Sequence, residues 1–169
     1  MDLTHRVATL DDLHPRRRET RDRAAAARLP HARAGRGQHQ MVGVGTQLLS
    51  DGTYIFLLAG DRIAGCGGWS YRRTLFGGDA SVIAREQETL DPSTDAARIR
   101  AMYTDPDFTR RGVGRRELGL CERAAWDSGF RRAEMMATIA GEPLYRSCGY
   151  VRLEEPITAE AGAATSARS

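Results

Sequence analysis

The feature that most constrains this chain is a change of hydrophobic period near residue 105. Residues 97–104 alternate in hydrophobicity, which predicts a strand with one face made of Ala97, Ile99, Ala101 and Tyr103. The sequence D-P-D at 105–107 ends that strand. Residues 112–128 then carry apolar side chains at helical spacing, with Leu118, Cys121 and Ala125 on the expected buried face and Gly129 as the stop. A strand that leads directly into a helix is typical of a mixed α/β fold.

The turn between these two elements, T-R-R-G-V-G-R-R at 109–116, has the composition of an anion-binding site. Its glycines let backbone N–H groups approach a phosphate closely, and the start of a helix supplies unsatisfied donors and about half a positive charge. Arginine side chains add paired hydrogen bonds to phosphate oxygens. A ligand with a pyrophosphate therefore fits this turn. The dinucleotide and P-loop patterns are disfavoured, because Glu117 stands where the third glycine is needed and the chain contains no lysine.

The rest of the chain predicts further strands and helices of one domain over residues 1–155. A nearly continuous apolar run, a Gly-Asp turn and a second run of strand-forming residues predict a hairpin over 54–70. The other expected elements are a strand at 5–9, a helix at 41–50, a loop at 71–96 with one helical turn at 81–88, a strand at 131–138, a short helix at 141–148 and a strand at 150–154. The tail 156–169, rich in Ala, Ser, Thr and Gly, is expected to be disordered and to contain no strand.

The net charge of +3 is unevenly distributed. Residues 13–40 hold eight arginines against Glu19 and Asp22, and they contain no aromatic, Ile or Val side chain. Such a segment buries little apolar area, so we expect a solvated and loosely ordered stretch. A basic arm for nucleic acid is the alternative, which is disfavoured because no aromatic side chains are present to stack on bases.

Other features bound the location and the chemistry. No apolar run reaches the roughly 18 residues of a membrane span, and the first residues contain no apolar leader segment. We therefore expect a cytoplasmic protein without a membrane contact. The three cysteines lie far apart, no C-x-x-C pair exists and all four histidines fall within the first 40 residues. Neither a metal site nor a disulfide framework is expected.

Taken together, the strand, D-P-D-F, T-R-R-G-V-G, the helix, the next strand and L-Y-R-S-C-G-Y resemble the GCN5-related N-acetyltransferase (GNAT) superfamily. The resemblance covers about residues 54–154 and is strongest over 99–150. The segments C-G-G-W-S and R-R-T-L-F-G-G-D look like an uncharacterised bacterial subgroup. The resemblance implies the acyl-CoA N-acyltransferase fold, a mixed and mostly antiparallel sheet flanked by helices, and acetyl-CoA as the co-substrate.

The resemblance also assigns roles to residues. Gly112 and Gly114 match the glycines of the family signature, whereas Thr109 stands where Gln or Arg is usual. The implied pyrophosphate-binding residues are Thr109, Arg110, Arg111, Gly112, Val113, Gly114 and Arg115. The implied backbone partners of the pantetheine arm are Met102, Tyr103 and Thr104. Tyr145 matches the family tyrosine that protonates the departing thiolate, which is chemically sensible because a phenol of pKa about 10 is protonated at neutral pH.

The acceptor side is less well defined by the sequence. Trp69 and Tyr71 are the expected acceptor-binding residues, with plain packing as the competing interpretation of Trp69. A base must take a proton from the amine, and the candidates near the expected acceptor loop are Asp79, Glu86 and Glu88. The family usually has helices where residues 13–40 show no amphipathic pattern, and a last strand where 156–169 shows none.

The expected function is transfer of an acetyl group from acetyl-CoA to a primary amine of an unknown acceptor, by direct attack in a ternary complex. A non-catalytic acyl-CoA-binding or sensing module and, less favoured, a nucleic-acid-binding protein are the alternatives. A homodimer is a further expectation from the family.

Overall fold

The computed structural model describes residues 2–13, 47–73, 88–153 and 163–168. Their elements, in chain order, are β1 (Thr4–Val7), η1 (Leu10–Leu13), β2 (Tyr54–Ala59), β3 (Arg62–Ser70), β4 (Ala97–Thr104), η5 (Pro106–Phe108), α3 (Val113–Asp127), β5 (Ala133–Thr138), α4 (Glu142–Ser147), β6 (Val151–Arg152) and β7 (Ala163–Arg168). Residues 47–50 are also helical. Three expected segments lie outside the described residues: the basic segment from residue 14 onward, the start of the helix expected at 41–50, and the helical turn expected at 81–88 apart from residue 88.

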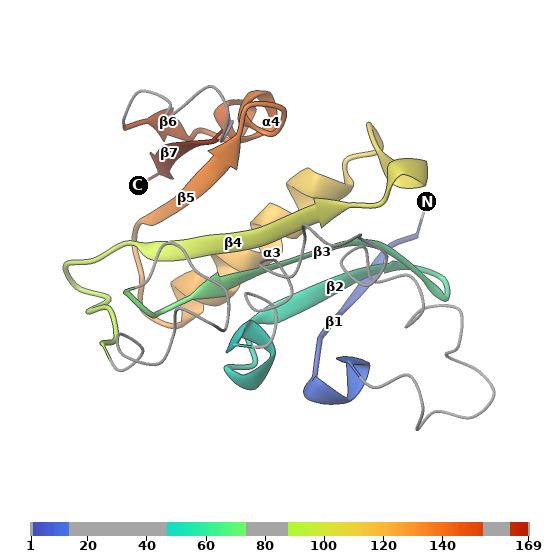
Figure 1. Cartoon of the computed structure of the whole chain (residues 1–169), viewed down its shortest axis with the longest axis horizontal. Helices are drawn as coiled ribbons and strands as arrows, with labels where there is room; N and C mark the ends of the chain where they lie inside the picture. The colour runs from blue at the N-terminus through green and yellow to red at the C-terminus, as the bar shows by residue number, and fades with distance from the viewer. Residues whose placement is uncertain (1, 14–46, 74–87, 154–162, 169) are drawn as a thin grey trace, which may run out of the picture.

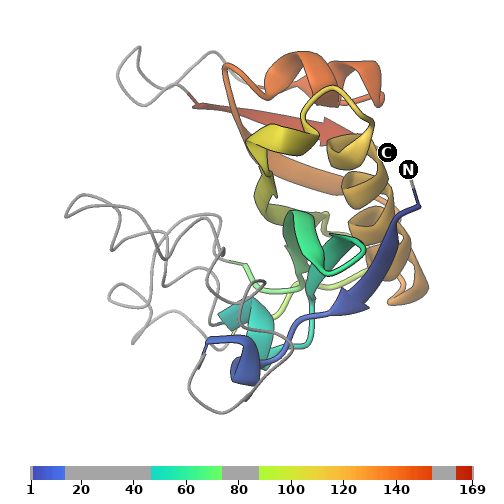
Figure 2. The same cartoon turned by 90° about the vertical axis from the view of Figure 1, so that its right-hand side faces the viewer.

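A seven-stranded sheet in the order β1-β2-β3-β4-β5-β7-β6 forms the centre of the structure (Figure 1). Neighbouring strands are antiparallel except for β4 and β5, which are parallel. Parallel neighbours need a crossover connection, and α3 provides it. Figure 2 shows α3 lying along one face of the sheet. The predicted mixed, mostly antiparallel sheet flanked by helices is confirmed.

Alternation along the strands divides the apolar side chains between the two faces of the sheet. The face covered by α3 and α4 buries, among others, Ile99, Leu118, Cys121, Met135 and Tyr145. The opposite face buries, among others, Leu48, Tyr54, Phe56 and Cys66. The apolar stripe expected for the helix at 112–128 therefore faces the sheet.

The last strand corrects a prediction. The sequence predicts no strand in 156–169, but β7 runs antiparallel between β5 and β6. Every residue of β5 pairs with a residue of β7, from Ala133↔Arg168 to Thr138↔Ala163. Two neighbouring strands supply backbone partners for this segment, so it pairs although A-A-T-S-A-R lacks hydrophobic alternation.

A bulge in β4 is the second difference from the sequence prediction. Strict alternation places Ala101 and Tyr103 on the helix-covered face, yet both pack on the opposite face, and Ala101 has a positive φ of 53°. Between the pairs Cys66↔Tyr103 and Gly68↔Arg100, β4 advances three positions while β3 advances two. One extra residue therefore reverses the faces of the second half of β4.

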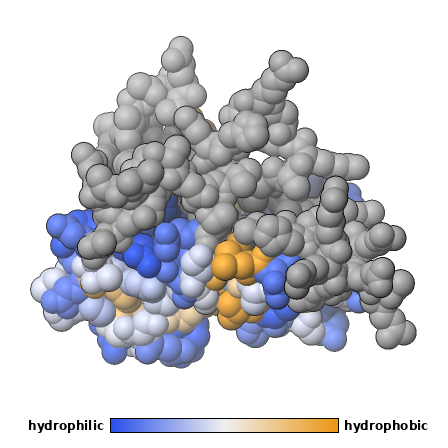
Figure 3. Space-filling view, turned by 60° about the horizontal axis from the view of Figure 1, so that its bottom comes forward, coloured by the Kyte–Doolittle hydropathy of each residue, from blue (hydrophilic) through white to orange (hydrophobic). Residues whose placement is uncertain are grey.

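The described surface is mixed. Figure 3 shows hydrophobic colour in small areas among hydrophilic ones on the face that it draws. The large apolar side chains that are exposed come from several separate elements and loops, namely Val7, Leu10, Trp126, Ile139, Val151 and Leu153. Within the described part of the chain, the helices are too short or too polar to cross a bilayer.

Candidate functional site

The parallel pair β4 and β5 shares only a short ladder. Its three residue pairs end at Ile99 and Met135, whereas β4 continues to Thr104 and β5 to Thr138. The two strands diverge beyond this ladder (Figure 1), and the bulge of β4 lies at the start of the divergence. We call the facing strand edges beyond the ladder, residues 100–104 of β4 and 136–138 of β5, the β4–β5 slot. The predicted pantetheine-pairing residues 102–104 belong to it.

α3 begins close to the open end of the β4–β5 slot. Its N-cap residue, Gly112, has a φ of 80°, a left-handed conformation that favours glycine. No side chain of the described residues caps this helix start, and the N–H of Arg116 is bonded to the Gly112 oxygen. The backbone N–H groups of residues 113–115 therefore have no acceptor within the helix, which is the arrangement that binds anions.

Gly114 sets the distance between this helix start and its neighbours. A Cβ at this position would stand 2.9 Å from Leu144 Cδ2 and 3.4 Å from Thr104 Oγ1. The absence of a side chain thus lets the start of α3 approach both the end of β4 and α4. The slot, the helix start and α4 meet at one place for this reason.

The arginines of the turn differ in their surroundings. Arg110 has a positive φ of 61°, and the side chains of Arg110 and Arg111 are exposed. Arg115 instead donates a hydrogen bond to Ser147 Oγ at 2.8 Å and lies 3.4 Å from the Ser147 carbonyl oxygen, which links α3 to α4. Arg110, Arg111 and Arg115 are all exposed beside the helix start, and Arg115 is held against α4.

The side chains of two other residues of the predicted set are engaged within the protein. The Thr109 hydroxyl donates to the Pro106 carbonyl oxygen at 3.0 Å, so it closes the preceding turn. The Val113 side chain is 1% exposed and packs in the core beside Phe108. Val113 is therefore placed to contact a ligand through its backbone amide and not through its side chain.

Tyr145 lies on α4 and is largely buried, with its ring 6.2 Å from the ring of Tyr150. It belongs to the same cluster as Met102, whose side chain the bulge turns toward the helix-covered face. Burial raises the pKa of the Tyr145 hydroxyl to about 12, and the nearby Glu117 contributes to the increase. The hydroxyl is therefore protonated at neutral pH and can donate a proton or a hydrogen bond.

Glu117 is a residue of this region to which the sequence reading assigned no role. Its side chain is 0% exposed, and neither carboxyl oxygen has a hydrogen-bond partner among the described residues. Gly65 in β3 makes room for it, since a Cβ there would stand 2.5 Å from Glu117 Oε2. Burial raises the pKa of this carboxyl to about 9. The available signal was its position four residues from both Val113 and Cys121, on the apolar stripe of the helix.

Trp69 and Tyr71 lie at the other end of α3. Trp69 is 6% exposed, and its ring contacts those of Tyr71 and Phe130 at centroid distances of 6.0 and 5.9 Å. Together with Ser128 at the end of α3 they line a cavity of about 460 Å³. The 15 residues of α3 span about 22 Å at about 1.5 Å per residue. The structure therefore brings together residues 102–104, 109–115 and Tyr145, but not Trp69 and Tyr71.

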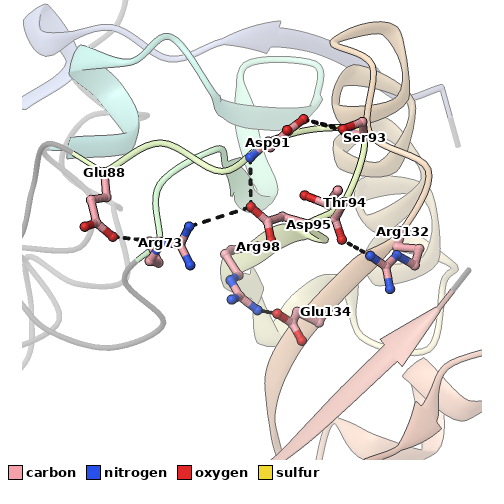
Figure 4. Close-up of polar contacts among 9 residues, drawn as sticks. All are labelled: Arg73, Glu88, Asp91, Ser93, Thr94, Asp95, Arg98, Arg132 and Glu134. Carbon is pink, nitrogen blue, oxygen red and sulfur yellow. Dashed lines mark hydrogen bonds and ion pairs between the residues drawn. The ribbon is translucent and has the colours of Figure 1, made fainter.

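The candidate bases are only partly described. Asp79 and Glu86 lie outside the described residues. Glu88 forms an exposed ion pair with Arg73, at 2.9 Å (Figure 4). The polar contacts drawn in Figure 4 lie near the beginnings of β4 and β5, where Arg98 pairs with Glu134 across the ladder. Over residues 2–13, 47–73, 88–153 and 163–168, no group of three His, Cys, Asp or Glu side chains is arranged to hold a metal ion.

A family model described as "Acetyltransferase (GNAT) family" matches residues 30–150, which is most of the chain. The chain belongs to the GNAT acetyltransferase family. No curated protein matches its sequence. The slot, the uncapped helix start and Tyr145 all lie within the matched region.

Solved structures share the fold of this GNAT protein at low sequence identity. Ard1 from Thermoplasma volcanium is 14% identical with a TM-score of 0.61, over 98% of this chain and 96% of that one. A putative N-acetyltransferase from Lactobacillus plantarum is 13% identical with a TM-score of 0.57, over 99% and 96%. N-acetylglutamate synthase from Neisseria gonorrhoeae is 13% identical with a TM-score of 0.56, over 99% of this chain and 35% of that one. The chain also spans 63% of a Pyrococcus horikoshii protein and 65% of a Staphylococcus aureus acetyltransferase, both at a TM-score of 0.48.

Proposed function

We propose that this GNAT protein transfers the acetyl group of acetyl-CoA to a primary amine by direct attack in a ternary complex. The observation that carries the proposal is the meeting of the β4–β5 slot, the uncapped start of α3 and the protonated Tyr145 at one place. The Neisseria gonorrhoeae synthase is complexed with coenzyme A. A putative streptothricin acetyltransferase from Bacillus anthracis, 14% identical with a TM-score of 0.51 over 68% of this chain and 60% of that one, is in complex with acetyl coenzyme A. These neighbours support the same class of ligand here.

The two ends of such a ligand suit two parts of the site. The amide groups of a pantetheine arm are able to pair with the backbone of Met102, Tyr103 and Thr104, as an added strand does at a sheet edge. The N–H groups of residues 113–115 and the exposed Arg110 and Arg111 suit the pyrophosphate. Because these contacts come from backbone amides and neighbouring arginines, the proposed site does not depend on Gln or Arg at position 109.

Tyr145 has the protonation state that the transfer requires. The amine nitrogen uses its lone pair to form the C–N bond, and the C–S bond breaks with its electron pair on sulfur. The Tyr145 hydroxyl donates its proton to that sulfur, and the proton lost by the amine restores the hydroxyl through water. The products are an N-acetyl amide and the thiol of CoA. Holding amine and thioester together supplies a large part of the rate.

Binding and turnover of the wild-type protein and of Tyr145→Phe test the proposal. We expect acetyl-CoA to raise the Tm of both proteins. With a panel of primary amines, we expect release of the CoA thiol by the wild type and a decrease of about 10²- to 10⁴-fold for Tyr145→Phe. Tyr150→Phe removes a neighbouring buried hydroxyl and is the matched control, with near wild-type turnover expected.

The outcomes separate catalysis from binding. A Tm that acetyl-CoA does not change would overturn the assignment of the slot. A ligand-dependent Tm without thiol release from any amine would leave a non-catalytic acyl-CoA-binding module. Equal turnover of the wild type and Tyr145→Phe would remove Tyr145 from the mechanism and leave the transfer reaction standing.

A further inference from the structure

Glu117 is a buried ionisable group that the proposed mechanism does not use. Polar side chains without partners are rare in protein interiors, because an unpaired carboxyl loses its hydration and gains nothing in return. Here both carboxyl oxygens have no hydrogen-bond partner among the described residues, at 0% exposure. A leucine in the same place would fill the helix–sheet interface without that cost. Packing of the fold therefore does not by itself explain a carboxyl at this position.

The surroundings of Glu117 place its carboxyl under β3 and next to Met102 of β4. Gly65 and Gly67 of β3 leave the space that it occupies: a Cβ at 65 would stand 2.5 Å from Oε2, and a Cβ at 67 would stand 3.4 Å from Cγ. The same Cβ at 67 would also collide with the sulfur of Met102, so Met102 and Glu117 are neighbours under β3. Tyr145, on α4, is near enough for the charge of Glu117 to raise its pKa.

We propose that Glu117 makes the transfer reaction sensitive to pH: its neutral form keeps the buried face beside Met102 uncharged while negative charge develops on the departing sulfur, and its carboxylate form slows the reaction. The inference rests on the proposed acetyl transfer. A neutral carboxyl leaves the thiolate and Tyr145 undisturbed. A carboxylate in the same low-dielectric place repels the thiolate, so the C–S bond breaks more slowly. Loss of the Glu117 proton should therefore inhibit the reaction.

The other ionisable groups around Glu117 do not titrate in the same pH range. Burial raises the pKa of Cys66, on β3, to about 12. It also raises the pKa of Tyr54, on β2, and the pKa of Cys121, on α3, well above their usual values. Burial likewise raises the pKa of Tyr103, on β4, and brings that of Tyr145, on α4, to about 12. No arginine is among the causes of the Glu117 shift, which is burial alone. Cys148 also faces Tyr145, so its thiol needs a control of its own.

The test compares wild type, Glu117→Gln and Glu117→Leu from pH 7 to 10 with saturating acetyl-CoA and one amine. The ratio of variant to wild-type kcat is the quantity measured, because titration of the amine is common to all three proteins and cancels. For Glu117→Gln we expect a ratio near one at pH 7 and about ten at pH 10, since a group of pKa about 9 is roughly nine-tenths ionised there. Both substitutions remove the titration, so the Glu117→Leu ratio should rise in the same way.

Controls separate this inference from the proposed function. The series is repeated with Cys148→Ala, which should leave the wild-type pH profile unchanged. Infrared difference spectra of the wild type should lose a protonated-carboxyl band between pH 8 and 10, and Glu117→Gln should lack that band. If thiol is released but the kcat ratio is constant with pH, or if the band is absent at pH 7, the role of Glu117 is overturned. If no variant releases thiol at any pH, the proposed function fails and this inference fails with it.

Discussion

A methyl group added at Gly65 tests the packing that surrounds Glu117. In Gly65→Ala the new Cβ would stand 2.5 Å from Glu117 Oε2, 2.8 Å from Val113 Cγ1 and 3.0 Å from the Tyr103 carbonyl oxygen. Ordinary contacts of a Cβ are 3.4–4 Å, so all three are too short. The carboxyl is able to move, but the Tyr103 oxygen belongs to the backbone of β4.

The expected loss of stability follows from these contacts. Overpacking of this kind costs about 1–3 kcal/mol, and three short contacts, one of them to the backbone, place Gly65→Ala in the upper half of that range. Alanine also restricts the unfolded chain, which stabilises by about 0.4–1 kcal/mol. The net loss is then about 1–2.6 kcal/mol, which lowers the Tm of a chain of this size by about 2–10 °C.

Thermal and urea unfolding measure this loss, with Gly119→Ala as the matched control. Gly119 is an exposed residue of α3 where a Cβ meets nothing within 4 Å, so alanine should stabilise the helix by up to about 1 kcal/mol. The double variant Gly65→Ala/Glu117→Ala should be more stable than the sum of the single changes predicts, by about 1 kcal/mol or more. An unchanged Tm for Gly65→Ala, or strict additivity in the cycle, would show that Glu117 does not pack under β3.

Three further changes test other parts of the structure. Trp69→Ala should cost about 3–5 kcal/mol in urea unfolding, because the ring is buried in the core, and a cost below about 1 kcal/mol would contradict that placement. Gly141→Ala puts a methyl group 2.9 Å from Tyr145 Cε2 at a φ of −84°, so kcat should fall about tenfold to a hundredfold and the Tm should fall by a few degrees, and an unchanged kcat would argue against the assigned position of the ring. Burial raises the pKa of Asp51, but hydrogen bonds from Arg72 and Gln47 outweigh it and give a net decrease. The carboxylate of Asp51 stabilises the folded protein above the pKa that it has in the unfolded chain, and this stability is lost as the pH falls through its pKa in the folded protein, below about pH 4. The urea-unfolding stability of Asp51→Asn should therefore depend less on acid pH than that of the wild type.

The sequence was sufficient for elements with a strong local pattern. The hairpin expected over 54–70 is β2 and β3, and the helix expected at 112–128 is α3. Their periods and turn residues lie within one short window each, so no knowledge of neighbouring elements was needed. β7 has no such pattern, because its partners β5 and β6 determine its conformation. Local reading of 163–168 therefore predicts a disordered tail.

Part of the candidate site was equally visible in the sequence. The two glycines at 112 and 114 predict a helix start with unpaired backbone N–H groups, and the start of α3 has that geometry. The bulge at Ala101 was not predictable from its neighbours, since it arises from the pairing of β4 with β3. The sequence does not single out Glu117, for a related reason. Its significance depends on two glycines some 50 residues earlier in the chain, which only the folded structure brings beneath it.

The three-pair ladder between β4 and β5 has a mechanical consequence. It divides the sheet into a four-stranded part and a three-stranded part, which share few backbone bonds and are spanned by α3. A molecule that pairs along β4 in the gap adds bonds across this junction. The fraction of protein with this molecule bound then determines how many backbone hydrogen bonds join the two parts of the sheet. Amide hydrogens along the facing edges of β4 and β5 should therefore exchange more slowly as the ligand concentration rises.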